Sequence, residues 1–294
     1  MTFAKRRIDL EFQLGLGAFG DGGLDTVRIS GLRCSANISK TGGNMAELDL
    51  RVWGLPLDIM NKLTVLNTVA YEEQRNNRII VYAGDEESGM SVCFTGTIRE
   101  AWADGRNAPD VMFHIAAFSG FFETIKPSPP VSYKGSVSAE IVFQGIATLM
   151  GFSLENNGVT GSIENPYWPG SIGAQLNKAL DAFHADRLED AVNRVLAIWP
   201  KGGSRTALST IRIAPDSGLV GYPGFTQTGV QFLSVYNPNL VFARQVEIES
   251  DFKAANKTWV VAAVSHNLDS NIPGGQWFTE ATCSLFGQPL ALSS

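Results

Sequence analysis

Histidine and cysteine are the side chains of this sequence best able to bind a metal or to act as a nucleophile. The three histidines are far apart, and none has the HxH, HxxE or HExxH spacing of a metal site. The three cysteines are equally scattered and odd in number, so we expect buried free thiols rather than disulfides or a zinc site. These residues are His114, His184, His266, Cys34, Cys93 and Cys283.

The most specific catalytic hypothesis that the sequence allows is that His266 acts as a general base. His266 is followed by Asp269, which could orient its imidazole, but no GxSxG serine is present to complete a hydrolase site. We therefore expect His266 to form structural hydrogen bonds. Glu247 and Glu249 share one face of a predicted strand, and that face should be exposed to solvent. The sequence thus predicts no catalytic, metal-binding or cofactor-binding residue, and a protein that is not an enzyme.

Residues 15–20 match the GxGxxG pattern of nucleotide-binding proteins. In that motif a helix must follow, because the free N–H groups at its N-terminus bind the pyrophosphate. Here Asp21-Gly22-Gly23 follows, and then residues typical of a strand, so no helix can begin cleanly. The pattern therefore indicates the turn of a β-hairpin and no nucleotide cofactor.

Strands are the main elements that must position these residues. Apolar residues alternate with polar ones over 8–14, 27–29 and 48–52, which is typical of strands with one buried face. Glycine-rich turns connect these segments, as in an antiparallel sheet or barrel. Asp58 is expected to cap a short helix that ends at Leu63. Further strands are expected near 78–83, 92–98 and 111–117.

Helical spacing replaces this alternation in the middle of the chain. Ser136 or Ser138 is expected to cap a helix that ends at Gly151, and Ser171 is expected to cap a second helix. Between the helices, Asn156-Asn157-Gly158 predicts a hairpin turn. From residue 201 the strand pattern returns.

These patterns predict a mainly β protein with an α+β insert. Two antiparallel β-barrel domains, residues 1–125 and 201–294, are expected to bracket a small mixed helix and hairpin domain at residues 126–200. Prolines within residues 126–130 favour an extended linker at the first boundary.

Composition excludes several classes of protein. The chain of 294 residues has a net charge of −6 and no cluster of Lys and Arg, so we expect no specific nucleic-acid binding. No apolar run approaches the roughly 18 residues of a membrane span, so stable membrane insertion is not expected. Residues 1–12 lack the apolar core of a secretory signal, and we expect the protein to fold in the cytoplasm.

Several short motifs follow one another along nearly the whole chain. They are residues 29–33 (ISGLR), 53–55 (WGL), 158–159 (GV), 165–167 (NPY), 218–223 (GLVGYP), 236–238 (YNP), 264–269 (VSHNLD) and 273–277 (PGGQW). In this order they resemble the baseplate hub proteins of contractile-tailed, myovirus-type bacteriophages. That family is related to the hub part of VgrG-type injection machines.

The resemblance implies a structural subunit without catalytic residues. Hubs of this kind are homotrimers in which two β-barrels per chain give a ring of six. Such a ring matches a sixfold tail tube or tube-initiator protein on one side and a threefold central spike on the other. It would lie in the tail baseplate of the virion, contact other baseplate proteins, let DNA pass and be assembled in the host cytoplasm. The net negative charge of the chain would suit the wall of a conduit, because it would repel DNA and prevent the DNA from sticking.

Trp53 and Trp102 are the candidate interface residues, because contacts between subunits bury aromatic side chains. Two other functions stay open at this stage. One is a glycan- or host-surface-binding β module of a tail, in which an exposed Trp168 or Trp277 would stack on sugars. The other is a tail-associated cell-wall hydrolase, although no acid, base or metal constellation supports it.

Overall fold

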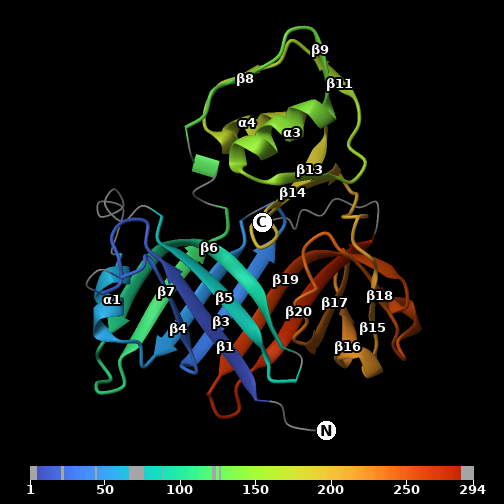
Figure 1. Cartoon of the computed structure of the whole chain (residues 1–294). Coiled ribbons are helices and arrows are strands. Elements are labelled where there is room, and N and C mark those ends of the chain that lie inside the picture. The colour runs from blue at the N-terminus through green and yellow to red at the C-terminus, as the bar shows by residue number, and fades with distance from the viewer. Residues whose placement is uncertain are drawn as a thin grey trace.

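One large sheet dominates the protein. The computed structural model describes residues 5–20, 23–43, 45–65, 76–87, 89–120, 124–125 and 127–285. Within these residues, 13 strands form a single, almost entirely antiparallel sheet, and a smaller unit with two helices lies above it (Figure 1). The prediction of a mainly β protein is confirmed.

Strands β1 to β7 and helix α1 form the N-terminal half of the sheet, in the order β3-β4-β7-β6-β5-β1-β2. Alternate apolar residues face one core, as in β1, where Ile8, Leu10 and Phe12 are buried. The elements are β1 (Arg6–Gln13), β2 (Thr26–Ser30), β3 (Arg33–Thr41), β4 (Glu47–Trp53), α1 (Leu57–Leu63), β5 (Arg78–Asp85), β6 (Gly89–Asp104) and β7 (Met112–Phe118).

Strands β15 to β20 form the C-terminal half around a second core, in the order β16-β17-β20-β19-β18-β15. This core includes Phe232, Val246 and Trp259. The elements are β15 (Ile211–Ile213), η2 (Pro215–Ser217), β16 (Leu219–Phe225), β17 (Gly229–Val235), β18 (Gln245–Ile248), η3 (Lys253–Ala255), β19 (Thr258–Ser270) and β20 (Trp277–Leu285).

Strand β19 belongs to both halves. Its first residues pair with β18, whereas Ala263–Ser270 pair with β3, and β20 accompanies it on the other edge. Its first part is buried on both faces, because Trp259 and Val261 face the C-terminal core and Val260 and Ala262 face the unit above. Such two-sided burial requires an unbroken apolar run, which the sequence supplies.

The middle unit comprises residues 127–200. Its three-stranded sheet has the order β10-β14-β13, with β10 and β14 parallel. On β14, Leu196 and Ile198 pack against the helices, whereas Ala197 and Trp199 pack toward β19. Its elements are β8 (Val131–Ser132), β9 (Ser136–Ser138), α3 (Ala139–Met150), β10 (Ser153–Asn156), β11 (Ser162–Glu164), β12 (Tyr167–Trp168), α4 (Ile172–Ala182), β13 (Ala185–Asp190) and β14 (Val195–Pro200).

Several local predictions agree with the structure. The residues after β1 lead into β2, which pairs with β1 in antiparallel fashion, so the GxGxxG segment connects a hairpin. Ser171 caps α4, because its side chain accepts a hydrogen bond from the Ala174 amide at 3.3 Å. Gly151 ends α3 with a left-handed φ of 73°.

Two local predictions are wrong. The turn at residues 156–158 does not join a hairpin, because β10 pairs in parallel with β14 from far along the chain. Asn156 instead closes the turn itself, with its side-chain oxygen accepting from the amides of Gly158 and Val159. Asp58 does not cap α1, since Pro56 occupies the N-cap position and Asp58 lies in the first turn.

The two predicted barrels are unconfirmed. Pairing among the described strands runs as one open path from β16 to β2, with β18 and β15 as a branch, and no pair closes either half. The domain boundaries stay predictions as well. None of the described helices is long and apolar enough to cross a membrane.

Candidate binding cleft

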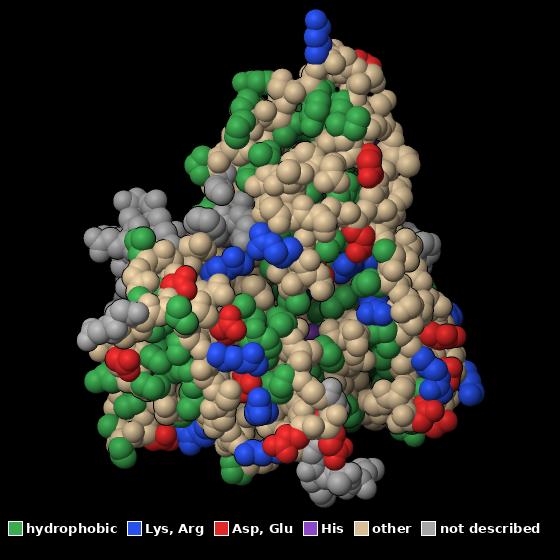
Figure 2. Space-filling model, viewed as in Figure 1, with side chains coloured by type: hydrophobic (Ala, Val, Ile, Leu, Met, Phe, Trp, Pro, Cys, Tyr) green, Lys and Arg blue, Asp and Glu red, His purple; other side chains and the backbone are tan. Residues whose placement is uncertain are grey.

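A cleft lies between the two halves of the sheet, beneath the middle unit. Figure 2 shows it as a hollow with hydrophobic side chains and a histidine at its bottom. Its upper cavity, of about 300 Å³, is lined by β3, β6 and β19, by residues 188–193 of the middle unit and by residues 238–242. A lower cavity of about 980 Å³ shares Ser91 and Pro238 with the upper one.

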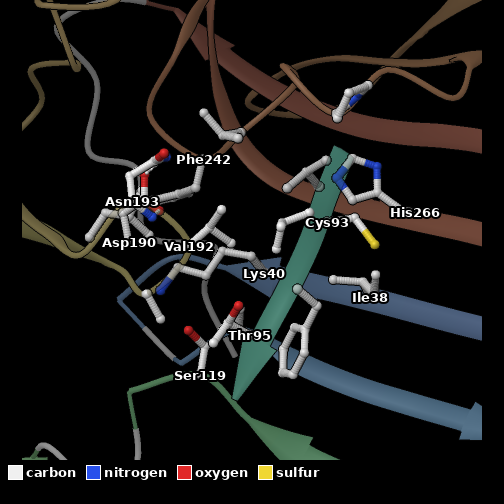
Figure 3. A pocket seen from close by; sticks show the side chains of 18 of the residues that line it. Ile38, Lys40, Cys93, Thr95, Ser119, Asp190, Val192, Asn193, Phe242 and His266 are labelled. Carbon is white, nitrogen blue, oxygen red and sulfur yellow. Dashed lines mark hydrogen bonds between the residues drawn. The ribbon is translucent and has the colours of Figure 1, made fainter. Parts of the chain in front are cut away.

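Four buried polar side chains from different elements line the upper cavity (Figure 3). Lys40 on β3 is 6% exposed, and Thr95 on β6 is 9% exposed. Ser119, just after β7, is 7% exposed, and His266 on β19 is 6% exposed. Ile38, Val264 and Phe242 supply apolar surface beside them. The cavity therefore combines an apolar wall with a few converging polar groups, as ligand sites do.

The His266 ring is held by a buried threonine hydroxyl. Nδ1 lies 2.9 Å from Oγ1 of Thr279, a fully buried residue whose oxygen already accepts from the Asn237 amide. The direction of this bond depends on which ring nitrogen carries the proton, because the Thr279 hydroxyl can donate to Nδ1 or accept from it. Burial lowers the pKa of His266 to about 4, so the ring is neutral at pH 7.

Lys40 brings a cation to the cavity. It continues the inward-facing row of β3 after Ile38, and its Nζ lies 5.4 Å from the centre of the Phe242 ring. Burial lowers the pKa of Lys40 to about 8, and the nearby Glu189 carboxylate limits the fall. Glu189 itself is held by the Arg187 guanidinium.

Cys93 is a poor nucleophile although it lines the cavity. Burial of its thiol raises the pKa to about 12, while the residue as a whole is only half-buried. The thiol donates to the Val81 carbonyl oxygen at 3.3 Å, and thiolate, not thiol, is the reactive form. No group of three His, Cys, Asp or Glu residues within the described part of the chain is placed to hold a metal.

A buried ion-pair cluster holds the middle unit over the cleft. Arg205 is 3% exposed, and its guanidinium bonds both carboxylate oxygens of Glu155, at 2.8 and 2.7 Å. A third contact reaches Asp190 at 3.3 Å. Because Glu155 lies on β10 and Asp190 ends β13, one side chain joins both edges of the small sheet to the segment before β15.

His266, the hypothetical general base, does not contact Asp269, the carboxylate that could have oriented its imidazole. Asp269 lies three residues after His266 on β19, so the two side chains point to opposite faces of the strand. Asp269 accepts from the Gln276 amide at 2.8 Å instead. Glu247 and Glu249 are exposed, as expected, and Glu249 pairs with Arg212 at 2.7 Å.

Trp53 and Trp102 lie outside the cleft, on the outward face of β4 and β6. Both are half-buried; Trp102 packs on His114 with ring centres 4.0 Å apart, and the Arg33 guanidinium lies 4.3 Å from the Trp53 ring. Strand β7 lies between them and pairs with both strands. Trp277 is 4% exposed and cannot form a sugar-stacking surface.

Sequence reasoning missed Lys40, Thr95 and Ser119. The signal for Lys40 was present, because it follows Cys34, Ala36 and Ile38 at alternate positions and so stands where a buried residue is expected. Thr95 and Ser119 carry no such signal, since their burial depends on the cleft that tertiary packing creates.

Comparison with known proteins identifies the family. The model of the family described as baseplate hub gp41 matches residues 30–283. A search of curated protein sequences finds no match.

Solved structures of tail and secretion proteins share the fold. The prophage MuSo2 43 kDa tail protein from Shewanella oneidensis has a TM-score of 0.59 at 7% identity, covering 94% of this chain and 96% of that one. The tail protein from Neisseria meningitidis MC58 has a TM-score of 0.61 at 8% identity, covering 96% and 98%. The E. coli c3393 protein, a type VI secretion component with structural similarity to T4 tail proteins gp27 and gp5, has a TM-score of 0.60 at 8% identity, covering 95% and 78%.

At such identities the solved structures establish likeness of fold alone. The family match, by contrast, spans most of the sequence and includes both halves of the sheet and the middle unit. This chain belongs to the baseplate hub gp41 family, whose members are structural proteins of the phage tail.

Proposed function

We propose that three copies of this chain form a ring at the centre of the baseplate, between the tail tube and the central spike. The observation that carries this proposal is the construction of the sheet. Each chain presents two strand assemblies with separate cores, joined through β19, so three chains present six. A ring with threefold symmetry and six similar modules can face a sixfold tube on one side and a threefold spike on the other.

We also propose that each half acts as a barrel-like module and that residues 1–125, 126–200 and 201–294 act as domains. Strand β19 and the Arg205 cluster tie these parts together. A subunit built this way can transmit force between tube and spike without shearing between its modules.

The outward face of β3, β4 and β19 suits the wall of a DNA conduit. Where β3 meets β19, the side chains on this face are short and bonded to one another: the Asn37 amide donates to Asn267 at 2.6 Å and to Ser265 at 3.0 Å. Arg51 on this face lies 3.8 Å from the Asp49 carboxylate. Cations that are already paired, in a chain of net charge −6, offer little to phosphate, so DNA can pass without binding.

Trp53 and Trp102 are proposed to contact the neighbouring subunit. They share one face of the sheet, each with a cation or an imidazole against its ring, and can lose their remaining exposed area in a subunit contact.

Light scattering after size-exclusion chromatography tests the ring. We expect a mass about three times the 31.7 kDa of the chain, for the purified protein or after the spike protein is added. Trp53→Ser with Trp102→Ser should lower this mass, whereas Trp168→Ser on the middle unit should not. A chain that stays monomeric in the presence of both tube and spike proteins would contradict the proposal.

A further inference from the structure

A third cavity, of about 300 Å³, lies where the loop after β1 meets helix α1, away from the cleft (Figure 1). The Lys62 ammonium on α1 connects the two elements, because it donates to the Ala18 carbonyl oxygen and lies 5.8 Å from the centre of the Phe19 ring. Asn77, just before β5, supplies a further part of the wall. The residues that line this cavity are Leu14, Leu16, Gly17, Ala18, Lys62 and Asn77.

Asn77 carries a buried donor without an acceptor. The residue is 2% exposed, and its side-chain oxygen accepts from the Gly15 amide at 3.0 Å. A backbone N–H can only donate, so this bond identifies the oxygen of the Asn77 amide group. The other atom, Nδ2, has no hydrogen-bond partner. Buried polar atoms are nearly always hydrogen-bonded, so an unpaired donor in the wall of a cavity indicates a site for an acceptor.

Other unbonded donors belong to the residues that line the cavity. The backbone amides of Leu16, Gly17 and Ala18 have no acceptor among the described residues. The Lys62 ammonium uses one of its three donors on the Ala18 carbonyl oxygen, and neither that contact nor the Phe19 ring neutralises its charge. No Asp or Glu is among the described residues that line the cavity. The site is therefore positively charged and rich in donors.

An oxyanion matches these donors. Hydrogen bonds to a charged acceptor are stronger than those to a neutral one, and the Lys62 charge favours a negative ligand. The donors come from three segments, so the four oxygens of a phosphate suit them better than the two of a carboxylate. Gly17 has a left-handed φ of 85°, as in turns whose successive N–H groups form anion-binding concavities. The volume is at the lower end of the roughly 300–1,000 Å³ of ligand pockets, which favours a small ion over a nucleotide.

We propose that this cavity binds an inorganic phosphate ion. The ion accepts hydrogen bonds from Nδ2 of Asn77, from the Lys62 ammonium and from backbone amides of residues 16–18. It thereby joins the loop after β1 to α1. The site differs from the nucleotide-binding motif that the glycines of this loop resemble, because a strand follows the loop and the cation comes from α1.

Phosphorus NMR of inorganic phosphate, titrated with the full-length chain at constant ionic strength, measures the binding. We expect a Kd on the order of 1 mM. Asn77→Asp keeps an oxygen for the Gly15 amide and puts a second, negatively charged oxygen in place of the Nδ2 donor. The affinity for phosphate should therefore fall by about tenfold or more. Asn107→Asp, at an exposed position between β6 and β7, makes the same change of charge and should leave the affinity unchanged.

Hydrogen exchange gives a second measurement on the same chain. Phosphate should slow exchange at the backbone amides of residues 16–18 and leave residues 105–107, in the loop after β6, unchanged. Lys62→Met removes the cation and should weaken phosphate binding by a factor similar to that of Asn77→Asp. Lys257→Met removes an exposed lysine elsewhere and should have no effect.

If Asn77→Asp fails to fold, Lys62→Met takes its place, because Lys62 is only half-buried. The proposal fails if phosphate changes neither its own signal nor the exchange of residues 16–18, or if Lys62→Met binds phosphate as the wild type does. It fails too if acetate at the same ionic strength protects these amides as well as phosphate, which would indicate a carboxylate site. Protection by a DNA duplex without protection by free phosphate would likewise overturn it.

Discussion

Arg205→Met removes the cation that joins the middle unit to the C-terminal half. The guanidinium is almost fully buried, and Glu155 and Asp190, its two partners, have side chains that are 19% and 11% exposed. The substitution keeps an unbranched side chain in place, so packing changes little. What it leaves behind is two carboxylates, largely out of water, without a counter-ion.

The expected cost follows from that burial. Breaking a buried ion pair by removing one partner typically costs about 3–5 kcal/mol, because the remaining charge stays buried. Arg212 is the matched control, since it also bonds two carboxylates, Asp216 and Glu249, both at 2.7 Å. Its side chain is 46% exposed, and exposed pairs contribute about 0–1 kcal/mol. Arg212→Met should therefore cost several-fold less than Arg205→Met.

Urea unfolding of both variants, followed by tryptophan fluorescence, measures the difference. Arg205 lowers the pKa of Glu155, so the pair contributes stability above the unfolded pKa, near 4.5, and loses it as pH falls through the folded pKa. The gap between the wild type and Arg205→Met should accordingly narrow in acid. Adding Glu155→Leu to Arg205→Met should recover part of the loss. Equal costs for the Arg205 and Arg212 variants would refute the reasoning.

Two further variants test the packing around β19. Trp199 is fully buried and its Nε1 has no partner among the described residues, so Trp199→Phe should cost under about 1.5 kcal/mol and Trp199→Ala about 3–5 kcal/mol in urea unfolding. His266 has a pKa of about 4 in the folded chain, compared with its ordinary value of 6.5. Between these two pH values the unfolded chain binds the proton and the folded chain does not. The free energy of unfolding therefore decreases as the pH is lowered, by at most about 3 kcal/mol. His266→Gln should remove that part of the pH dependence, and an unchanged slope would show that the ring is not the group that titrates.

Local chemistry explains what could be predicted from the sequence. Alternation placed β1, β4, β5 and β7, and a serine with a helical pattern after it placed α4, because these signals lie within a few residues of one another. Strand β16 has no such signal, since its glycines and Pro223 outweigh its apolar residues. It forms at the end of the sheet path, where proline is tolerated.

The cleft could not be predicted in the same way. Lys40, Thr95, Ser119 and His266 come from four separate segments, and their burial arises only when the two halves and the middle unit come together. A single sequence gives the face of each residue on its own strand, but not which strand lies opposite. Only Lys40 has a local signal that could have been used, because it is a charged residue in an otherwise apolar row.

Strand β19 explains why the halves form one sheet rather than two independent modules. Ala263 to Ser270 pair with β3 along their whole length, so separating the halves would expose eight consecutive residue pairs of backbone. Unpaired buried backbone groups each cost free energy comparable to a lost hydrogen bond, so the junction is among the strongest places in the fold rather than a hinge. The cleft in front of β19 therefore has a rigid floor.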